Sequence, residues 1–343
     1  TKEQFLKDVI AGVIVAIIAL PLSIALALAS GVTPQMGIYT AIIAGFVISF
    51  LGGSRVQIAG PTAAFATIVA GIVAKNGMDG LVVATIMAGI ILIIMGLFKV
   101  GNLIKFIPYT ITTGFTAGIA VTIIIGQLKD FMGLTIITKE PVTETVEKLV
   151  SVGRSIGTIN LWALMIGCIC LAILIAWPRL PLLSKIPGSL VAVLVSGIVV
   201  AICHLPVRTI GDLYTISNQL PSFNLPIINF NMVKTLLPDA FTIAILAGIE
   251  SLLSCVVADS MVNSKHRSNM ELVAQGAGNI ASALFGGIPA TGAIARTAAN
   301  VKNGGRTPIA GMVHSITLLL ILVILMPYAA LIPMPAIAAI LFK

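Results

Sequence analysis

The chain has 343 residues, of which 58% are hydrophobic and only 9% are charged. Soluble domains carry about 25% charged residues, so this composition excludes a cytosolic enzyme, a disordered protein and a nucleic-acid binder. About 20 apolar residues cross a bilayer as a helix, which leaves room for roughly a dozen spans. The sequence therefore predicts an all-α polytopic membrane protein.

The net charge of +8 fits the orientation of such a protein. Basic residues collect in cytoplasmic loops, and most loop Lys and Arg residues fall inside when the N-terminus is placed in the cytoplasm. We therefore expect a multi-pass protein of the cell membrane with a cytoplasmic N-terminus. The four cysteines lie in apolar runs, and no His, Cys or carboxylate cluster has metal-ligand spacing, so we expect no metal and no cofactor.

Apolar runs broken by Gly, Pro or charged residues predict the spans in chain order. They lie near residues 8–29, 34–53, 80–98, 107–127, 159–177, 186–203, 236–259, 270–286, 308–326 and 328–341. Two further segments, 56–75 and 288–302, are shorter. If both also cross the membrane, most basic loops fall on the cytoplasmic side. The connection 128–158 carries four charged residues at helical spacing, which predicts a short interfacial helix. These residues are Glu140, Glu144, Glu147 and Lys148.

The two shorter segments share a pattern of chain breakers. In GGSRVQIAGPTAAFAT at 52–67, an extended stretch precedes Pro61, which suits the first turn of a helix that begins inside the membrane. In FGGIPATGAIART at 285–297, Gly-Gly again leads through a short extended piece to small residues. Irregular backbone at this depth is tolerated only inside protein or beside a wet cavity.

This matched pair predicts two half-helices that face each other at mid-membrane. Seven crossings per half would invert the second copy, as in the inverted repeats of secondary transporters. Each half-helix N-terminus offers unpaired N–H groups and a partial positive charge, which together attract an anion. Small side chains at Ala63, Ala64, Gly292 and Ala293 would leave the backbone accessible to a ligand. The alternative is ordinary close packing of helices through small residues.

Few charged residues are expected deep in the membrane. Four acidic residues near span ends are expected to reach the interface: Asp8, Asp239, Asp259 and Glu271. Glu250 is about 15 Å from either end of its span, so its carboxyl group must be protonated, paired or in water. Ser254, one turn away, is expected to share its hydrogen bonds. We interpret Glu250 as the group that exchanges a coupling proton; the alternative is a structural hydrogen bond between helices.

Arg296 is the second charge expected at depth, one turn into the second half-helix. It would either add a fixed positive charge beside the anion site or neutralise Glu250. The alternative is that its long side chain reaches the cytoplasmic surface. His314 is expected to be a satisfied packing residue rather than a proton relay.

Several motifs resemble the SulP family of sulfate permeases and related anion exchangers. They are TPQMGIY at 33–39, GGSR at 52–55, GPTAA at 60–64, AGIESLL at 247–253 and GGIPATGA at 286–293. The resemblance runs essentially from end to end. Two further motifs, KHRSN at 265–269 and ARTAANV at 295–301, look most similar to C4-dicarboxylate-type bacterial members.

The resemblance implies inverted seven-helix repeats, as in nucleobase transporters, that form a core and a gate domain with half-helices in spans 3 and 10. Residues 1–127 would hold core spans 1–4 and gate span 5, and residues 128–203 gate spans 6 and 7. Residues 204–326 would hold an external loop and core spans 8–11, and residues 327–343 gate span 12. Spans 13 and 14 and a cytoplasmic STAS domain are expected beyond Lys343, and the full-length protein is expected to be a homodimer.

The resemblance also implies where the anion binds. The lining residues would be Thr62 and Ala63 on the first half-helix and Ala293, Ile294, Ala295 and Arg296 on the second. Leu22, just after a kink at Pro21, stands where many relatives have Gln, which favours a larger or partly apolar anion. Sodium-coupled bicarbonate members have Asp at the Glu250 position and Thr at the Ile294 position. Because sodium prefers oxygen ligands, proton coupling is expected instead.

These observations predict a secondary active anion transporter that carries sulfate or a C4-dicarboxylate with a proton by an elevator mechanism. The alternatives are a bicarbonate transporter or a passive anion channel of the same fold. An intramembrane enzyme is disfavoured because Glu250 has no paired Asp, metal cluster or Ser/His partner. Arg296 and the shortage of polar side chains disfavour a nucleobase carrier. We expect a small anion, a coupling proton and the lipid bilayer as partners, and no nucleic acid.

Overall fold

The computed structural model describes residues 2–102, 109–136, 145–179 and 187–343, and these are helical apart from two short strands and the connections. The elements of the first part are α1 (Lys2–Ala29), α2 (Pro34–Leu51), β1 (Ala59–Gly60), α3 (Ala63–Leu97), α4 (Tyr109–Phe131), α5 (Thr145–Arg154), η2 (Ile156–Thr158), α6 (Leu161–Ala176), η3 (Trp177–Arg179) and α7 (Gly188–Ile202). They are followed by α8 (Ile210–Leu213), α9 (Phe230–Val262), α10 (Ser268–Leu284), β2 (Thr291–Gly292), α11 (Ile294–Lys302), α12 (Pro308–Leu325), η4 (Met326–Leu331) and α13 (Met334–Phe342).

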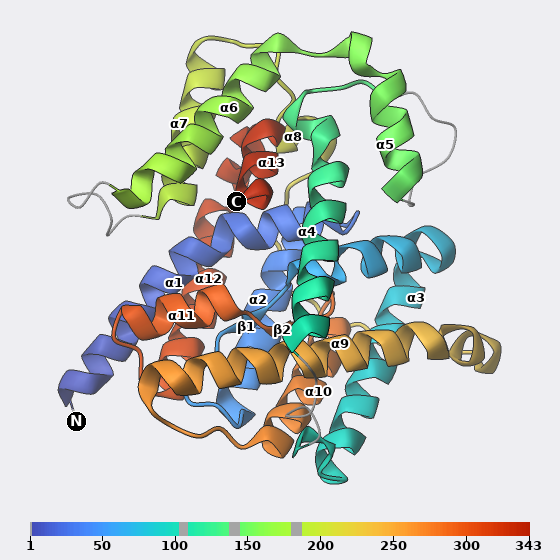
Figure 1. The fold of residues 1–343 in the computed structure, drawn as a ribbon, viewed down its shortest axis with the longest axis vertical. Helices are drawn as coiled ribbons and strands as arrows, with labels where there is room; N and C mark the ends of the chain where they lie inside the picture. Colours follow the sequence, from blue (N-terminus) through green and yellow to red (C-terminus); the bar gives the residue numbers. More distant parts are fainter. Residues whose placement is uncertain (1, 103–108, 137–144, 180–186) are drawn as a thin grey trace.

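The helices form two groups, which Figure 1 shows one above the other. The upper group contains α5, α6, α7, α8 and α13, and the lower group contains α2, α3, α9, α10, α11 and α12, with α1 crossing between them. α13 packs against α4, α6 and α7, whereas α3 packs against α9 and α10, and α12 against α1 and α2. The division into core and gate domains would place α4, α6, α7 and α13 together in the gate. That division stays a prediction.

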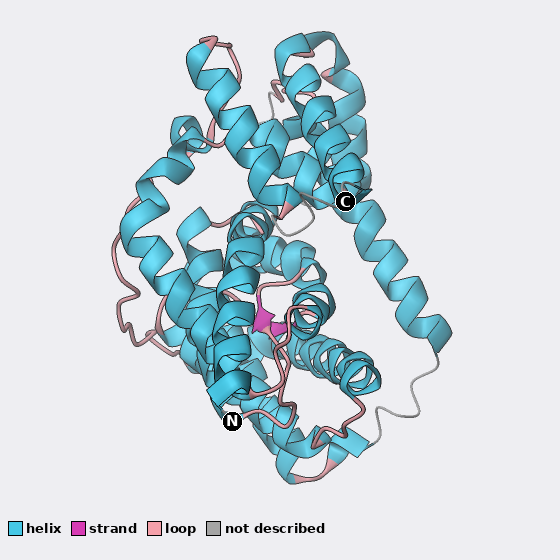
Figure 2. Ribbon diagram, turned by 90° about the vertical axis from the view of Figure 1, so that its left-hand side faces the viewer, coloured by secondary structure: helices cyan, strands magenta, loops and turns pink. Residues whose placement is uncertain are grey.

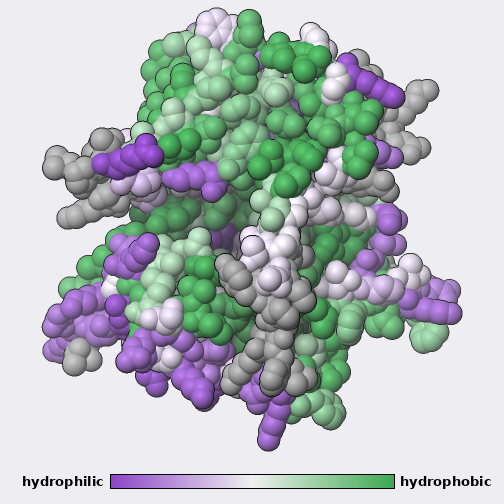
Figure 3. All heavy atoms as spheres, in the orientation of Figure 1, coloured by the Kyte–Doolittle hydropathy of each residue, from purple (hydrophilic) through white to green (hydrophobic). Residues whose placement is uncertain are grey.

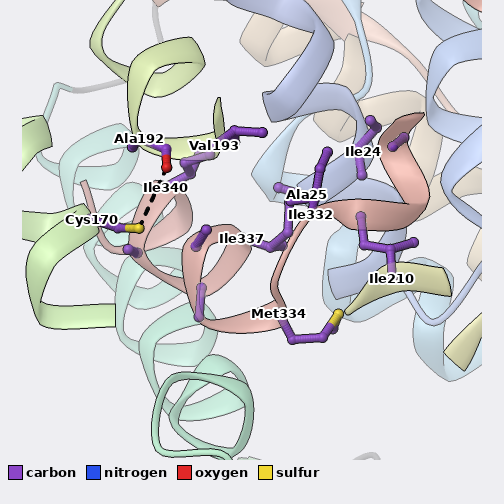
Figure 4. Packing of buried hydrophobic residues seen from close by; sticks show 14 of the residues in the cluster. Ile24, Ala25, Cys170, Ala192, Val193, Ile210, Ile332, Met334, Ile337 and Ile340 are labelled. Atoms are coloured by element: carbon purple, nitrogen blue, oxygen red, sulfur yellow. Dashed lines mark hydrogen bonds between the residues drawn. The ribbon is translucent and has the colours of Figure 1, made fainter. Parts of the chain in front are cut away.

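Two clusters of buried apolar side chains join these helices. The larger cluster connects α6, α7 and α13 to α1, α2 and α12. Figure 4 shows part of it, with Val193, Ile337 and Ile340 near Cys170, whose thiol donates to Ala192 O at 3.7 Å. The second cluster connects α3, α9 and α10. Inside a membrane, such close packing replaces the exclusion of water as the force between helices.

Six helices of the described chain are long and apolar enough to cross a bilayer. They are α1, α2, α3, α6 with η3, α9, and α12 with η4; α7 is apolar but shorter. Their outward faces carry large apolar side chains, such as Leu161 at 75% and Ile202 at 73% exposure. In Figure 3 the visible face of the upper group is largely hydrophobic. The chain therefore has the predicted all-α polytopic membrane fold.

The first half-helix ends close to the predicted residue 75 but begins later than predicted. The sequence predicts separate crossings over 56–75 and 80–98, and α3 indeed consists of two helices that meet at the non-helical residue Gly77. The chain bends at Gly77, where φ is 69° and ψ is −170°, a conformation that glycine adopts without a Cβ clash. The helix begins at Ala63 after the N-cap residue Thr62, so Pro61 precedes the cap instead of occupying the first turn.

The predicted interfacial helix corresponds to α5. Glu147 and Lys148 lie on this helix, whereas Glu140 and Glu144 lie outside the described residues. With 10 residues, α5 is too short to cross a bilayer, which takes about 20 residues. Its position between two apolar helices therefore fits the membrane interface.

Two acidic residues expected at the interface are buried against other parts of the protein. Asp8 is 0% exposed and accepts hydrogen bonds from the backbone N–H of Arg306 at 2.7 Å and from Thr307 Oγ1 at 2.7 Å. It thereby ties α1 to the start of α12. Glu271 is also 0% exposed. The position of both residues at the membrane interface stays a prediction. The sequence does not indicate that these span ends are packed against other segments.

Candidate anion site at two half-helices

Two extended segments meet among the helices of the lower group, where Figure 2 shows the two short strands side by side. β1 and β2 pair in antiparallel fashion, with Ala59 opposite Gly292. Ala293 N extends the pairing by donating to Ile58 O at 2.9 Å. Because α3 and α11 follow directly after these strands, the two helices start beside each other. Antiparallel pairing is the relation that two inverted repeats predict for their equivalent segments.

The first turns of α3 and α11 leave backbone N–H groups unpaired. Neither helix has a side-chain hydrogen bond at its N-cap residue. Within the described chain, the amides of Ala63, Ala64, Ile294 and Ala295 have no hydrogen-bond acceptor, as is usual for the first turn of a helix. Both helix starts also carry a partial positive charge. An anion placed between them would accept hydrogen bonds from these amides.

Two other amides predicted to be accessible are already engaged. Gly292 N donates to Ser251 Oγ at 3.0 Å, and Ala293 N donates to Ile58 O at 2.9 Å. The sequence correctly indicates small residues at these positions. Their backbone donors, however, hold the two strands and α9 together and are not free for a ligand.

The remaining predicted lining residues differ in exposure. Ala64 is 5% exposed, whereas Ile294 is 46% exposed and Ala295 is also exposed. Ala63 is partly exposed, so the accessible edges of the two half-helices are Ala63 on one side and Ile294 and Ala295 on the other. Leu22 lies within the continuous helix α1 and packs against the larger apolar cluster.

Glu250 lies beside the start of the first half-helix. Its Oε2 accepts a hydrogen bond from Thr62 Oγ1 at 2.9 Å. Thr62 is the N-cap residue of α3, but it uses its hydroxyl for Glu250 and not to cap the helix. Ser254, expected to share the hydrogen bonds of Glu250, donates instead to Thr297 Oγ1 at the long distance of 3.4 Å. The structure therefore joins Glu250 to α3 and Ser254 to α11.

Arg296, in the first turn of α11, is 1% exposed, which excludes an approach to the cytoplasmic surface. Its Nη2 donates to Pro61 O at 3.2 Å, and its Nη1 lies against Gly60, where a Cβ atom would overlap it. In the described chain Nε and Nη1 have no partner, and Glu250 forms no salt bridge with Arg296. Its positive charge is thus uncompensated next to the start of α3. His314 is also buried without a partner among the described residues, so it is not the satisfied packing residue that the sequence predicts.

A polar stripe on α10, which sequence analysis missed, holds both extended segments. Glu271, Gln275 and Asn279 follow one another at every fourth position, and all are 0% exposed. Glu271 Oε2 accepts from Gly53 N at 2.8 Å, and Gln275 Nε2 donates to Glu271 Oε1 at 2.9 Å. Asn279 donates to Ala290 O at 2.9 Å and accepts from Ala290 N at 2.8 Å. Polar residues at this spacing share one helix face, which is a signal visible in the sequence.

Ser251, another residue that sequence analysis missed, fixes Glu250 relative to the strands. Its Oγ lies 2.7 Å from Thr291 Oγ1 and accepts from Gly292 N. Its carbonyl oxygen accepts from Gln57 Nε2 at 2.9 Å. Both extended segments are therefore attached to α9 at the residue next to Glu250.

Together these features define a class: a polytopic membrane protein in which two half-helices, unpaired amides and a buried arginine form a site suited to a small anion. Comparison with known proteins identifies the family. The chain belongs to the sulfate permease family, whose model matches residues 5–343.

Individual relatives agree with this family. The chain is 46% identical to "Putative sulfate transporter YvdB" of Bacillus subtilis, over 99% of this chain and 64% of that protein. It is 35% identical to the bicarbonate transporter BicA of Synechocystis, over 98% of this chain and 60% of that protein. The chain thus spans less than two thirds of the length of either relative. The solved transmembrane domain of a cyanobacterial BicA matches with a TM-score of 0.89 at 29% identity, over 100% of this chain and 88% of that chain.

Proposed function

We propose that the full-length protein is a secondary active anion transporter that carries sulfate or a C4-dicarboxylate together with a proton. The observation that carries this proposal is the pairing of two uncapped helix N-termini beside the uncompensated Arg296. Membership of the sulfate permease family supports transport. Bicarbonate is the second candidate substrate because a relative at 35% identity is named as a bicarbonate transporter. A passive anion channel is the alternative mode.

The hydroxyl of Thr62 supplies a physical basis for coupling the proton to the anion. An ionised Glu250 can only accept hydrogen bonds, so the Thr62 hydroxyl must point its hydrogen at the carboxylate. The distance from Thr62 Oγ1 to Glu250 Oε2 is 2.9 Å. A protonated Glu250 donates to Thr62 Oγ1 instead, and the hydroxyl hydrogen turns toward the anion. Protonation also removes a negative charge near the anion. Proton and anion therefore bind more tightly together than alone, and this coupling is reciprocal.

In the proposed transport cycle the half-helices move as one unit against the gate helices, as in an elevator. The hydrogen bonds from α9 and α10 to both extended segments support a single moving unit, because they connect both half-sites to the same two helices. We further propose a homodimer in the cell membrane with the N-terminus in the cytoplasm.

Uptake by the full-length protein in proteoliposomes tests the coupling. An inward proton gradient should drive uptake of a labelled anion above equilibrium, which a passive channel does not do. Glu250→Gln should retain anion binding but lose the response to the gradient. Thr62→Val should weaken that response, and Thr62→Ser should preserve it. Ser254→Ala is the matched control, because Ser254 donates to Thr297. Unchanged pH dependence in Glu250→Gln would refute proton coupling.

Binding measurements test the substrate and the role of Arg296. Competition by sulfate, succinate, fumarate, bicarbonate and oxalate against one labelled anion ranks the candidate substrates. Arg296→Met should reduce anion affinity in calorimetry by about tenfold or more, the value of a hydrogen bond to a charged group. An unchanged affinity would exclude Arg296 from the site.

A further inference from the structure

A cavity of about 660 Å³ lies beside the first half-helix. Its lining includes Ala70 and Ala74 of α3, Gln127 of α4 and Lys148 of α5. Ala70 is seven residues beyond Ala63, so the cavity begins about 10 Å along the helix from its start, at 1.5 Å per residue. With the N-terminus in the cytoplasm, this half-helix runs outward, and the cavity lies on the outer side of the half-helix pair.

A second cavity of about 380 Å³ adjoins the first, and Lys129, Asp130 and Met334 line both. Arg208 lines the second cavity. Among the described lining residues, Lys129, Lys148 and Arg208 are basic and Asp130 is acidic. Asp130 lies within electrostatic range of Lys129 and Arg208. The joined cavities, which we call the outer vestibule, therefore carry a surplus of positive charge from these residues.

Lys148 is the least exposed of the three basic residues in this lining. It is half-buried, and this burial lowers the pKa of its ammonium group because desolvation disfavours the charged form. Within the described chain neither Lys148 nor Lys129 forms a salt bridge. An anion in the outer vestibule would supply the missing negative charge.

We propose that the outer vestibule is a second anion-binding site, which holds a small oxyanion such as sulfate before it reaches the half-helices. A concave site with surplus positive charge and low-dielectric walls raises the local concentration of anions. The statement that the bound oxyanion is also the transported substrate rests on the proposed function. The preference of the vestibule for anions over cations is independent of the proposed function.

Charged thiol reagents test the vestibule without any transport measurement. Ser151 lines the vestibule, and Ser222 is exposed in the loop before α9. Each is changed to Cys in the full-length protein, in a background whose accessible cysteines, Cys168 and Cys203 in this chain, are replaced by Ser. Rates of modification are measured with an anionic and a cationic methanethiosulfonate. The anionic-to-cationic ratio should be at least about threefold higher for Ser151→Cys, the effect of one charge a few ångströms away. Equal ratios at the two positions would overturn the proposal.

Charge variants and an added anion complete the test. Lys129→Gln and Lys148→Gln should each lower the ratio measured with Ser151→Cys. Arg179→Gln, which removes an exposed charge on η3 outside the vestibule lining, should leave it unchanged. Sulfate should slow the anionic reagent more than gluconate does at equal ionic strength. Absence of this protection, or an equal effect of Arg179→Gln, would overturn the vestibule. Positive results in a protein that takes up no anion would instead contradict the proposed transport function.

Discussion

The buried carboxylate of Glu271 offers the sharpest test of how the first half-helix is held. Glu271→Ala removes the acceptor of three hydrogen bonds, from Gly53 N at 2.8 Å, Ser54 N at 3.1 Å and Gln275 Nε2 at 2.9 Å. Each buried donor left unsatisfied costs about 1–3 kcal/mol, so the variant should lose roughly 3–9 kcal/mol of unfolding free energy. Water entering the vacated space would bring the loss toward the lower figure. Titration of the full-length protein with SDS in mixed micelles measures this free energy.

The variant Glu271→Gln separates hydrogen bonding from charge. Its amide oxygen still accepts from Gly53 N and Ser54 N. Its NH₂ group faces Gln275, whose Oε1 has no partner in the described chain and can accept after the side-chain amide flips. Because this variant also avoids burying a charge, its stability should stay within about 1 kcal/mol of the wild type. If Glu271→Gln loses as much stability as Glu271→Ala, the negative charge itself, and not the hydrogen bonds, holds the segment.

Two further predictions concern packing around the strands and the attachment of α12. In Gly292→Ala the new Cβ overlaps Nε2 and Cδ of buried Gln57, so the melting temperature should fall, with a cost of about 1–3 kcal/mol for overpacking. Gly71→Ala, where nothing lies within 4 Å, should be neutral or stabilise helix α3 by up to about 1 kcal/mol; equal shifts in the two variants would contradict this. Asp8→Ala should speed amide hydrogen exchange at Thr307, because the donors at the start of α12 lose their acceptor, and Asp8→Asn should do so less. Unchanged exchange in Asp8→Ala would show that other contacts hold this helix.

The half-helices were predictable because their signals are local. Gly-Gly pairs and Pro61 interrupt apolar runs, and these breakers mark where the helix must stop and restart. The non-helical backbone at Gly77 separates the two helices within α3, between the predicted crossings 56–75 and 80–98. A glycine between two apolar runs is the local signal for this break.

Pairing between distant polar groups was not predictable in the same way. Glu271 is the fourth residue of α10, and nothing in the local sequence tells that the start of this helix packs against Gly53. Similarly, the amide of Gly292 looks as free as that of Ile294 until Ser251 is placed beside it. Glu250 and Arg296 were identified from their depth alone. Their partners, Thr62 and Pro61, depend on the strand pairing.

The pairing of the two strands has a consequence for the insertion of the protein into the membrane during synthesis. Ile58 N donates to Thr297 Oγ1, which lies 239 residues further along the chain. Until the ribosome has made the second half, the polar backbone of the first extended segment has no partner, and hydrocarbon cannot supply one. The nascent first half must therefore keep this segment near water or the insertion machinery and complete its membrane integration only when the second half arrives.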